Sequence, residues 1–192
     1  MPPSGAGVAL PRGEPVIRVA TRHDLEALVA AFGQRMLFTD RIGRTRQQAG
    51  ELLIAWVGDV PVGDVYLWCE ALEEPELRAH FPGVPLLNHL EVAGDWRGRG
   101  VGTALVRAVE QAAARRGHQR LLLGVAPENA RAKGLYGRLG YADWGGGTIV
   151  SRWTEPDGHG GIRQASMTVD IMVTTLDPDR GLHGGAGARV QG

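Results

Sequence analysis

The sequence has little of what would tie it to an oxidising compartment or to a membrane. Cys69 is the only cysteine among 192 residues, so no disulfide can form within the chain, and a reducing compartment is the simplest interpretation. Cys69 follows an apolar run, so we expect a buried strand residue rather than a nucleophile. No run approaches the ~20 apolar residues of a membrane span, and the first residues do not read as a signal peptide. The sequence therefore predicts a cytoplasmic protein without a membrane partner.

An excess of charge of one sign is also absent. The chain has 21 basic and 21 acidic residues, and Lys133 is its only lysine. Proteins that bind nucleic acid usually carry a basic excess, at least on one face. The balanced charge therefore disfavours nucleic acid as a partner.

The chain length suits one domain with its own hydrophobic core. Residues 1–15 and 177–192 are rich in glycine and other small residues, so they bury too little apolar surface to fold. We expect disorder in both end segments. The sequence predicts a single ordered domain over residues 16–176.

Hydrophobic periodicity predicts helices interleaved with hairpins. Helical spacing occurs over residues 21–32, 102–116 and 129–139, and 41–49 is expected to hold a short helix. Strands are expected at 16–20, 51–57, 60–70, 86–92, 120–125, 141–153 and 167–175. This order predicts an α+β fold, with a mixed, mostly antiparallel sheet of about seven strands flanked by about four helices.

A glycine-rich loop, DWRGRGVGT over residues 95–103, stands between a predicted strand and an amphipathic helix. The N-terminus of a helix offers unpaired N–H groups and partial positive charge, so it can hold a pyrophosphate. Glycine lets the backbone approach a phosphate, and Arg97 and Arg99 could add charge-assisted hydrogen bonds. The loop therefore predicts a phosphate-containing ligand.

Two common phosphate-binding patterns do not fit this loop. A Rossmann loop needs G-x-G-x-x-G, but Thr103 stands where the third glycine should be. A Walker loop needs a glycine followed by lysine, which this segment lacks. The loop does fit R-x-x-G-x-G, carried by Arg97, Gly100 and Gly102. In this it resembles the acyl-CoA pyrophosphate loop of the GNAT superfamily of acetyl-CoA-dependent N-acetyltransferases.

A second segment strengthens the resemblance. Residues 129–141 read NARAKGLYGRLGY, which is similar to the family's N-x-x-A-x-x-L-Y…G-[FY]. Gly134 and Gly137 are a departure, because each glycine inside a helix costs about 0.5–1 kcal/mol relative to alanine. The resemblance covers residues 86–141 and implies the GNAT fold, acetyl-CoA as cosubstrate and no metal. It implies that the cosubstrate is bound by Leu90, Glu91, Val92, Arg97, Gly98, Arg99, Gly100, Val101, Gly102, Thr103, Asn129, Ala132, Leu135 and Tyr136.

The resemblance also implies direct attack of a neutral amine on the thioester in a ternary complex. Tyr136 matches the family tyrosine near the CoA sulfur, which implies a general acid. His89 and Glu91 are two apart on one predicted strand, so both should point to one face and need partners or a task there. Glu91 is the candidate general base, directly or through a water, with His89 as helper or alternative. Pairing of both with helix residues at the sheet surface is the other interpretation.

The acceptor amine is the least determined feature. The acidic stretch 70–76 could attract a cationic amine, or it could be a solvated loop. The long excursion 154–165 loosely resembles an extension of some antibiotic-modifying members of the family. We expect a small-molecule amine, including an antibiotic, as the acceptor. A protein N-terminus or lysine, and a non-catalytic acyl-CoA sensor, are the alternatives; a homodimer is left open.

Overall fold

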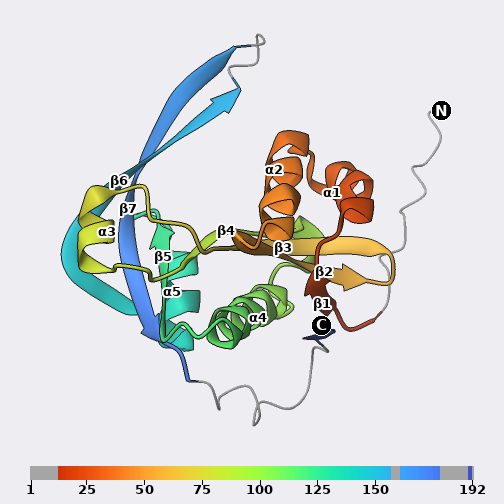
Figure 1. Cartoon of the computed structure of the whole chain (residues 1–192). Coiled ribbons are helices and arrows are strands. Elements are labelled where there is room, and N and C mark those ends of the chain that lie inside the picture. Colours follow the sequence, from red (N-terminus) through yellow and green to blue (C-terminus); the bar gives the residue numbers. More distant parts are fainter. Residues whose placement is uncertain (1–12, 157–160, 178–189, 192) are drawn as a thin grey trace, which may run out of the picture.

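One sheet of eight strands organises the residues that the computed structural model describes, which are 13–156, 161–177 and 190–191 (Figure 1). The strands are β1 (Val16–Val19), β2 (Gly50–Val57), β3 (Val60–Trp68), β4 (Leu86–Val92), β5 (Arg120–Val125), β6 (Ala142–Pro156), β7 (Ile162–Thr175) and β8 (Val190–Gln191). Their order in the sheet is β6-β7-β5-β4-β3-β2-β1-β8. The β4–β5 and β1–β8 pairs are parallel and the other pairs are antiparallel. The predicted mixed, mostly antiparallel sheet is confirmed.

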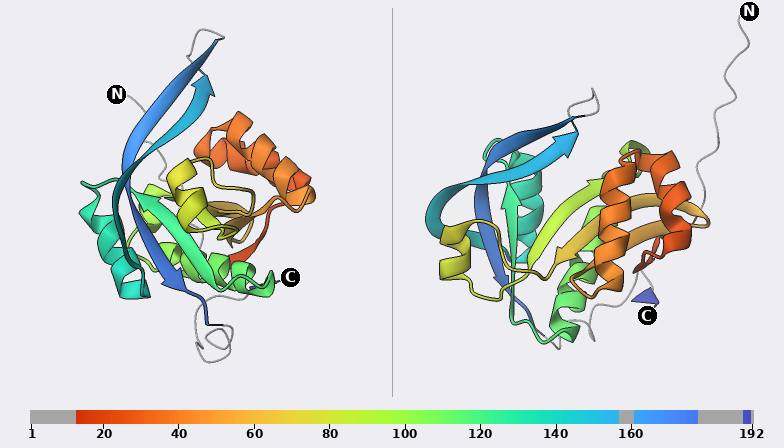
Figure 2. Two further views of the ribbon diagram at one scale, coloured as in Figure 1. Left: turned by 60° about the vertical axis from the view of Figure 1, so that its left-hand side comes forward. Right: turned by 45° about the horizontal axis from the view of Figure 1, so that its top comes forward.

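Helices cover both faces of this sheet (Figure 2). They are α1 (Leu25–Phe32), α2 (Arg35–Arg46), α3 (Pro75–His80), α4 (Val101–Arg115) and α5 (Ala130–Leu139), with 3₁₀ turns η1 (Arg22–Asp24) and η2 (Gly94–Trp96). Helices α4 and α5 share one apolar cluster, whereas α1 and α2 pack in a second cluster and α3 in a third. The sequence did not predict α3, because its six residues are too few to establish a helical period.

Strand β2 shows why its sequence is almost continuously apolar. Leu53 and Ala55 pack in the cluster with α4, whereas Leu52 and Ile54 pack in the cluster with α1 and α2. All four side chains are buried. A strand covered by helices on both faces needs apolar residues at consecutive positions rather than at alternate ones.

The helical segment after β1 begins with the capping arrangement expected at Thr21. The backbone N–H of Thr21 donates to Asp24 Oδ2 at 2.7 Å. Arg18 donates to both oxygens of the same carboxylate, at 2.8 and 2.7 Å. The Arg18 guanidinium is the largest cause that lowers the pKa of Asp24 to about 2, although burial opposes it. This contact fastens η1 to β1, the strand that carries Arg18.

Strands β6 and β7 form a two-stranded ribbon that reaches well beyond the body of the molecule (Figures 1 and 2). Their pairing runs from Ala142↔Val173 to Pro156↔Ile162. The sequence predicted a loop-like excursion at 154–165, whereas strand structure continues to Pro156 and resumes at Ile162. The turn expected at 156–158 lies mostly outside the described residues.

The predicted disorder at both ends concerns residues that lie largely outside the described part, namely 1–12, 178–189 and 192. Two residues of the C-terminal segment, Val190–Gln191, form β8 and pair in parallel with Ile17 and Arg18. Among the described residues, none of the helices has the length and apolar character needed to span a membrane.

Candidate functional site

Strands β4 and β5 separate soon after they begin. They pair in parallel at Leu86↔Leu122 and Leu87↔Leu123, yet β4 continues to Val92 and β5 to Val125. On its other side β4 stays paired with β3 as far as Val92↔Gly63. The separation leaves the later part of β4 without a strand neighbour on one side (Figure 1). A ligand could therefore pair with its backbone there.

The loop that follows β4 needs glycine for its backbone conformation. Gly98 and Gly100 have φ values of 76° and 85°, in the left-handed region that other residues rarely adopt. A Cβ atom at either position would meet no atom within 4 Å, so space does not require glycine. The first hydrogen bond of α4 runs from the Ala104 N–H to the Gly100 carbonyl oxygen. The N–H groups of residues 101–103 therefore have no partner within the helix.

Two arginines of the loop are held close to it. Arg97 Nε donates to the carbonyl oxygen of Val92 at 2.9 Å, which ties the loop to the end of β4. The Arg99 guanidinium lies 5.3 Å from the ring centroid of Trp96, which is itself buried. Both arginine residues remain largely exposed to solvent. The loop thus presents free N–H groups and two cations next to the open side of β4, as an anionic ligand requires.

Helix α5 begins beside the separated strands with a side-chain cap. Asn129 Oδ1 accepts a hydrogen bond from the Ala132 N–H at 3.0 Å. The interior glycines of this helix are not explained by packing within the described residues. A Cβ at Gly137 would meet no atom within 4 Å, and a Cβ at Gly134 would meet only the end of Arg138, at 3.5 Å. The hydrogen bond from Ala132 gives Asn129 a structural role at the start of α5, in addition to any contact with a ligand.

Tyr136 projects from α5 into the core cluster that α4 and α5 share. Its side chain is 6% exposed, and its ring centroid lies 5.7 Å from that of Tyr141. Burial raises the pKa of Tyr136 to about 12. Within the described residues its hydroxyl makes no hydrogen bond, and it is not among the fully enclosed polar atoms, as the Tyr141 hydroxyl is. Tyr136 therefore keeps its proton at neutral pH and can donate it to a ligand.

A β-bulge at His89 shapes the other side of the site. Leu90 pairs with Val65 and Asn88 with Tyr66, so His89 is an extra residue in β4, with a left-handed φ of 51°. Strict alternation, from which the shared face of His89 and Glu91 was predicted, therefore does not hold here. The two side chains nevertheless lie together, because the bulge turns residues 88, 89 and 91 toward the face covered by α2.

The buried carboxylate of Asp64 completes a polar cluster that sequence reasoning missed. Asp64 is the register partner of Glu91, so both side chains lie on the same face. His89 Nε2 lies 3.3 Å from Asp64 Oδ1 and 3.5 Å from Glu91 Oε2. Gln34, just before α2, donates from Nε2 to Glu91 Oε2 at 3.0 Å. An acidic residue inside the apolar stretch 60–68 was the signal that could have identified Asp64.

Burial dominates the electrostatics of this cluster. It raises the pKa of Asp64 to about 8, with a further increase from Glu91 and an opposing effect of Arg41. Burial also lowers the pKa of His89, while Glu91 raises it and Arg41 lowers it. Arg41 lies over the ring of Tyr66, 4.2 Å from its centroid, and donates to Asn88 Oδ1 at 3.3 Å. The cluster therefore holds titratable groups close to the open part of β4.

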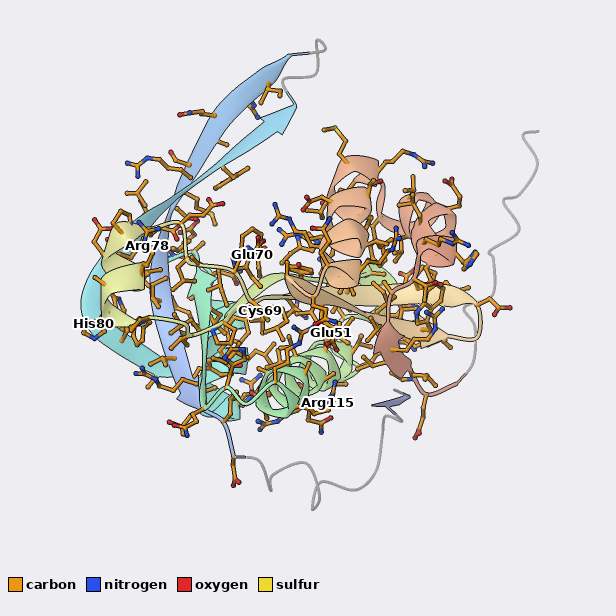
Figure 3. All side chains as sticks on the ribbon, viewed as in Figure 1. Glu51, Cys69, Glu70, Arg78, His80 and Arg115 are labelled. Atoms are coloured by element: carbon orange, nitrogen blue, oxygen red, sulfur yellow. The ribbon has the colours of Figure 1, made fainter. Side chains whose placement is uncertain are left out.

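Two of the four glutamates in residues 70–76 have side-chain partners. Glu70 pairs with Arg44 of α2, and Glu74 accepts a hydrogen bond from Ser151 Oγ at 2.7 Å. Glu70 lies near the centre of the molecule, apart from Arg78 and His80 of α3 (Figure 3). The pairing with Arg44 therefore offsets the charge of Glu70, whereas the partner of Glu74 is a neutral hydroxyl.

Cys69 lies directly after β3 rather than within a strand, and it is half-buried. Its backbone N–H donates to the Ala49 carbonyl oxygen at 3.1 Å. Burial raises the pKa of the thiol. A raised pKa leaves little thiolate at neutral pH, which agrees with the prediction that Cys69 is not a nucleophile.

The model of the acetyltransferase (GNAT) family matches residues 20–141. Two curated relatives match shorter segments. Over 56 residues the chain is 38% identical to the uncharacterized N-acetyltransferase YobR of Bacillus subtilis, covering 29% of this chain and 23% of the relative. Over 87 residues it is 36% identical to the uncharacterized N-acetyltransferase MJ1207 of Methanocaldococcus jannaschii, covering 45% of this chain and 37% of the relative. The match thus spans well under half the length of either relative.

Solved structures share the fold at low sequence identity. An N-acetyltransferase from Staphylococcus aureus Mu50 aligns with a TM-score of 0.61 at 14% identity, covering 86% of this chain and 100% of that one. A GNAT family acetyltransferase from Elizabethkingia anophelis with acetyl-CoA bound aligns with a TM-score of 0.56 at 15% identity, also covering 86% and 100%. This likeness confirms the fold that the two sequence motifs implied.

Proposed function

Because the chain belongs to the acetyltransferase (GNAT) family, we propose that it transfers the acetyl group of acetyl-CoA to a primary amine, with a small molecule as the acceptor. One observation carries this proposal. The loop before α4 follows the open part of β4, beyond the point where β4 and β5 separate, and the Asp64–His89–Glu91 cluster lies on β3 and β4. Tyr136 is on α5, the helix that follows β5.

The residues at this place suit acetyl-CoA. The N–H groups of residues 98–103 would hold its pyrophosphate, with Arg97 and Arg99 adding positive charge. The backbone of residues 90–92 would pair with the pantetheine arm, and Asn129, Ala132 and Leu135 would line its path. A related fold binds acetyl-CoA in the Elizabethkingia anophelis structure, which supports this assignment. Acetyl-CoA supplies an acetyl group activated as a thioester.

The reaction needs a neutral amine, whereas an alkyl ammonium has a pKa near ~10.4. Glu91 would take the excess proton, directly or through a water, with His89 3.5 Å away as helper or alternative. Tyr136 would donate its hydroxyl proton toward the leaving sulfur. A backbone N–H of β4 would stabilise the negative charge that builds on the carbonyl oxygen.

Titration of the protein with acetyl-CoA by calorimetry tests the binding site. Gly100→Glu should abolish binding, because a negative side chain would stand where the pyrophosphate is held. Gly117→Glu is a matched control, because Gly117 also has a left-handed φ, of 83°, but lies just beyond the other end of α4. Equal loss of binding in both variants would mean that lost stability, rather than the loop, explains the result. No binding by the wild type would reject the site.

Turnover with a panel of amines tests the chemistry. Glu91→Gln should lower turnover by about 10²–10⁴-fold and leave the affinity for acetyl-CoA unchanged. Glu26→Gln removes an exposed carboxylate of α1 and serves as control. Unchanged turnover and pH dependence in Glu91→Gln would reject Glu91 as the base. Peptides that react when small amines do not would replace the acceptor class, and binding without any turnover would favour an acyl-CoA sensor.

A further inference from the structure

Asp64, His89 and Glu91 direct ligand atoms toward one another on the α2 side of β3 and β4. His89 Nε2 lies 3.3 Å from Asp64 Oδ1 and 3.5 Å from Glu91 Oε2, and one ligand atom from each residue lies within 4.8 Å of the other two. Asp64 is fully buried. Within the described residues, neither its carboxylate oxygens nor His89 Nε2 has a hydrogen-bond partner. Buried polar atoms without partners are costly, so the cluster lacks a group that would satisfy them.

The spacing of these atoms suits a bound ion better than direct hydrogen bonds. An N–H···O hydrogen bond has a length of about 2.9 Å. In a tetrahedral zinc site with bonds of about 2.0–2.2 Å, two ligand atoms lie about 3.4 Å apart. The two separations from His89 Nε2, 3.3 and 3.5 Å, lie on either side of this value. These two separations fit ligand atoms around one small cation, and the third, between Asp64 and Glu91, is no more than 4.8 Å.

We propose that Asp64, His89 and Glu91 form a binding site for a divalent first-row transition-metal ion, for which Zn²⁺ is the best match. One imidazole and two carboxylates are ligands that Zn²⁺ commonly takes, and three protein ligands leave the fourth position to water. Ca²⁺ and Mg²⁺ prefer oxygen ligands alone and more of them. An ion bound here would have carboxylates on two sides, one of them at the buried end of the site.

Some residues around the Asp64–His89–Glu91 cluster favour binding of a cation, and one opposes it. Gln34 fixes the Glu91 carboxylate through the 3.0 Å hydrogen bond to Oε2, as partners of metal ligands commonly do. The side chains of His89 and Glu91 are 25% and 35% exposed, so an ion can reach them from solvent. Arg41 is the opposing charge, because it acts on both Asp64 and His89. Because burial raises the pKa of Asp64 to about 8, a bound cation must displace the proton that Asp64 carries at neutral pH.

A bound ion would occupy the two groups to which we assign the proton transfer. Zn²⁺ should therefore inhibit acetyl transfer, and this consequence rests on the proposed function. Binding of the ion does not rest on it, because the three ligands are held by strands β3 and β4 whether or not an acetyl group is transferred. Binding is therefore measured first, without acetyl-CoA or amine.

The test uses the full chain without an affinity tag, stripped of metal with a chelator. Calorimetry with Zn²⁺ gives the stoichiometry and affinity, and visible absorption with Co²⁺ reports a tetrahedral site. We expect one ion per chain. Glu91→Gln and His89→Gln should each weaken binding by at least the roughly 10–100-fold that loss of a ligand's supporting partner costs. His118→Gln is the control, since it removes a half-buried imidazole near the end of α4 and should change nothing.

Asp64→Asn should weaken binding to a similar extent. Because Asp64 is buried, thermal unfolding must first show that this variant is folded, and the other two variants decide the matter if it is not. Absence of one-to-one binding, or full affinity in both Glu91→Gln and His89→Gln, would overturn the proposal. A chain that binds Zn²⁺ but acetylates no amine would support the metal site and count against the proposed function. A chain that acetylates amines but binds no ion would support the proposed function and overturn the metal site.

Discussion

Replacement of Tyr136 by phenylalanine tests whether Tyr136 is the proton donor of the proposed reaction. It also tests how burial changes the strength of this acid. The pKa of about 12 means that roughly 1 in 100 hydroxyl groups is ionised at about pH 10, whereas half would be ionised for an exposed tyrosine. Complete proton transfer to a thiolate, with a pKa near ~8.5, would be unfavourable by about 5 kcal/mol. Tyr136 should therefore act mainly as a hydrogen-bond donor to the leaving sulfur.

We accordingly expect Tyr136→Phe to lower turnover by about 10²-fold, the lower end of the range for general acids. The assay follows thiol release at saturating acetyl-CoA, with the affinity for acetyl-CoA measured separately and expected to be unchanged. Activity needs the protonated phenol, so it is lost only as the pH rises toward the pKa of Tyr136. The ratio of wild-type to variant turnover should thus stay constant between about pH 7 and about pH 10.

The neighbouring Tyr141 provides the control for this experiment. Its ring packs against that of Tyr136, and its buried hydroxyl has no hydrogen-bond partner within the described residues, so Tyr141→Phe should retain turnover. Near-wild-type turnover in Tyr136→Phe would refute the role of the acid. A decline of the wild type near pH ~10 that Tyr136→Phe lacks would refute the effect of burial on its pKa.

Three further substitutions test stability. Asp24→Asn should cost about 2 kcal/mol at neutral pH, because Arg18 holds the folded-state pKa near 2 against 3.8; in urea unfolding the difference from wild type should vanish as the pH falls toward 2. Gly137→Ala should add about 0.5–1 kcal/mol, since its Cβ would meet nothing, and a lower melting temperature would contradict this. Asn129→Ala should cost about 1 kcal/mol by loss of the cap, and Asn129→Asp should restore it; equal melting of all three forms would contradict this.

Much of the fold was predictable from the sequence because the signals involved are local. The helical period of residues 102–116 and the apolar strands on either side gave the order of the central elements, which the structure confirms. Helix α3 and the far end of the β6–β7 ribbon, beyond the strands predicted at 141–153 and 167–175, were missed for opposite reasons. The first is too short for a period, and the second has strand residues where glycine and polar residues favoured a loop.

The sequence by itself determined the loop before α4 and the cap of α5, because both depend on residues close together in the chain. Gly98 and Gly100 allow a left-handed backbone, and Asn129 reaches an N–H three residues away. Only the tertiary structure decided the partners of His89 and Glu91. Asp64 is 25 and 27 positions away from them, and it joins them through the register of β3 with β4 and through a bulge. Pairing between strands brings such distant residues together, and no local period encodes it.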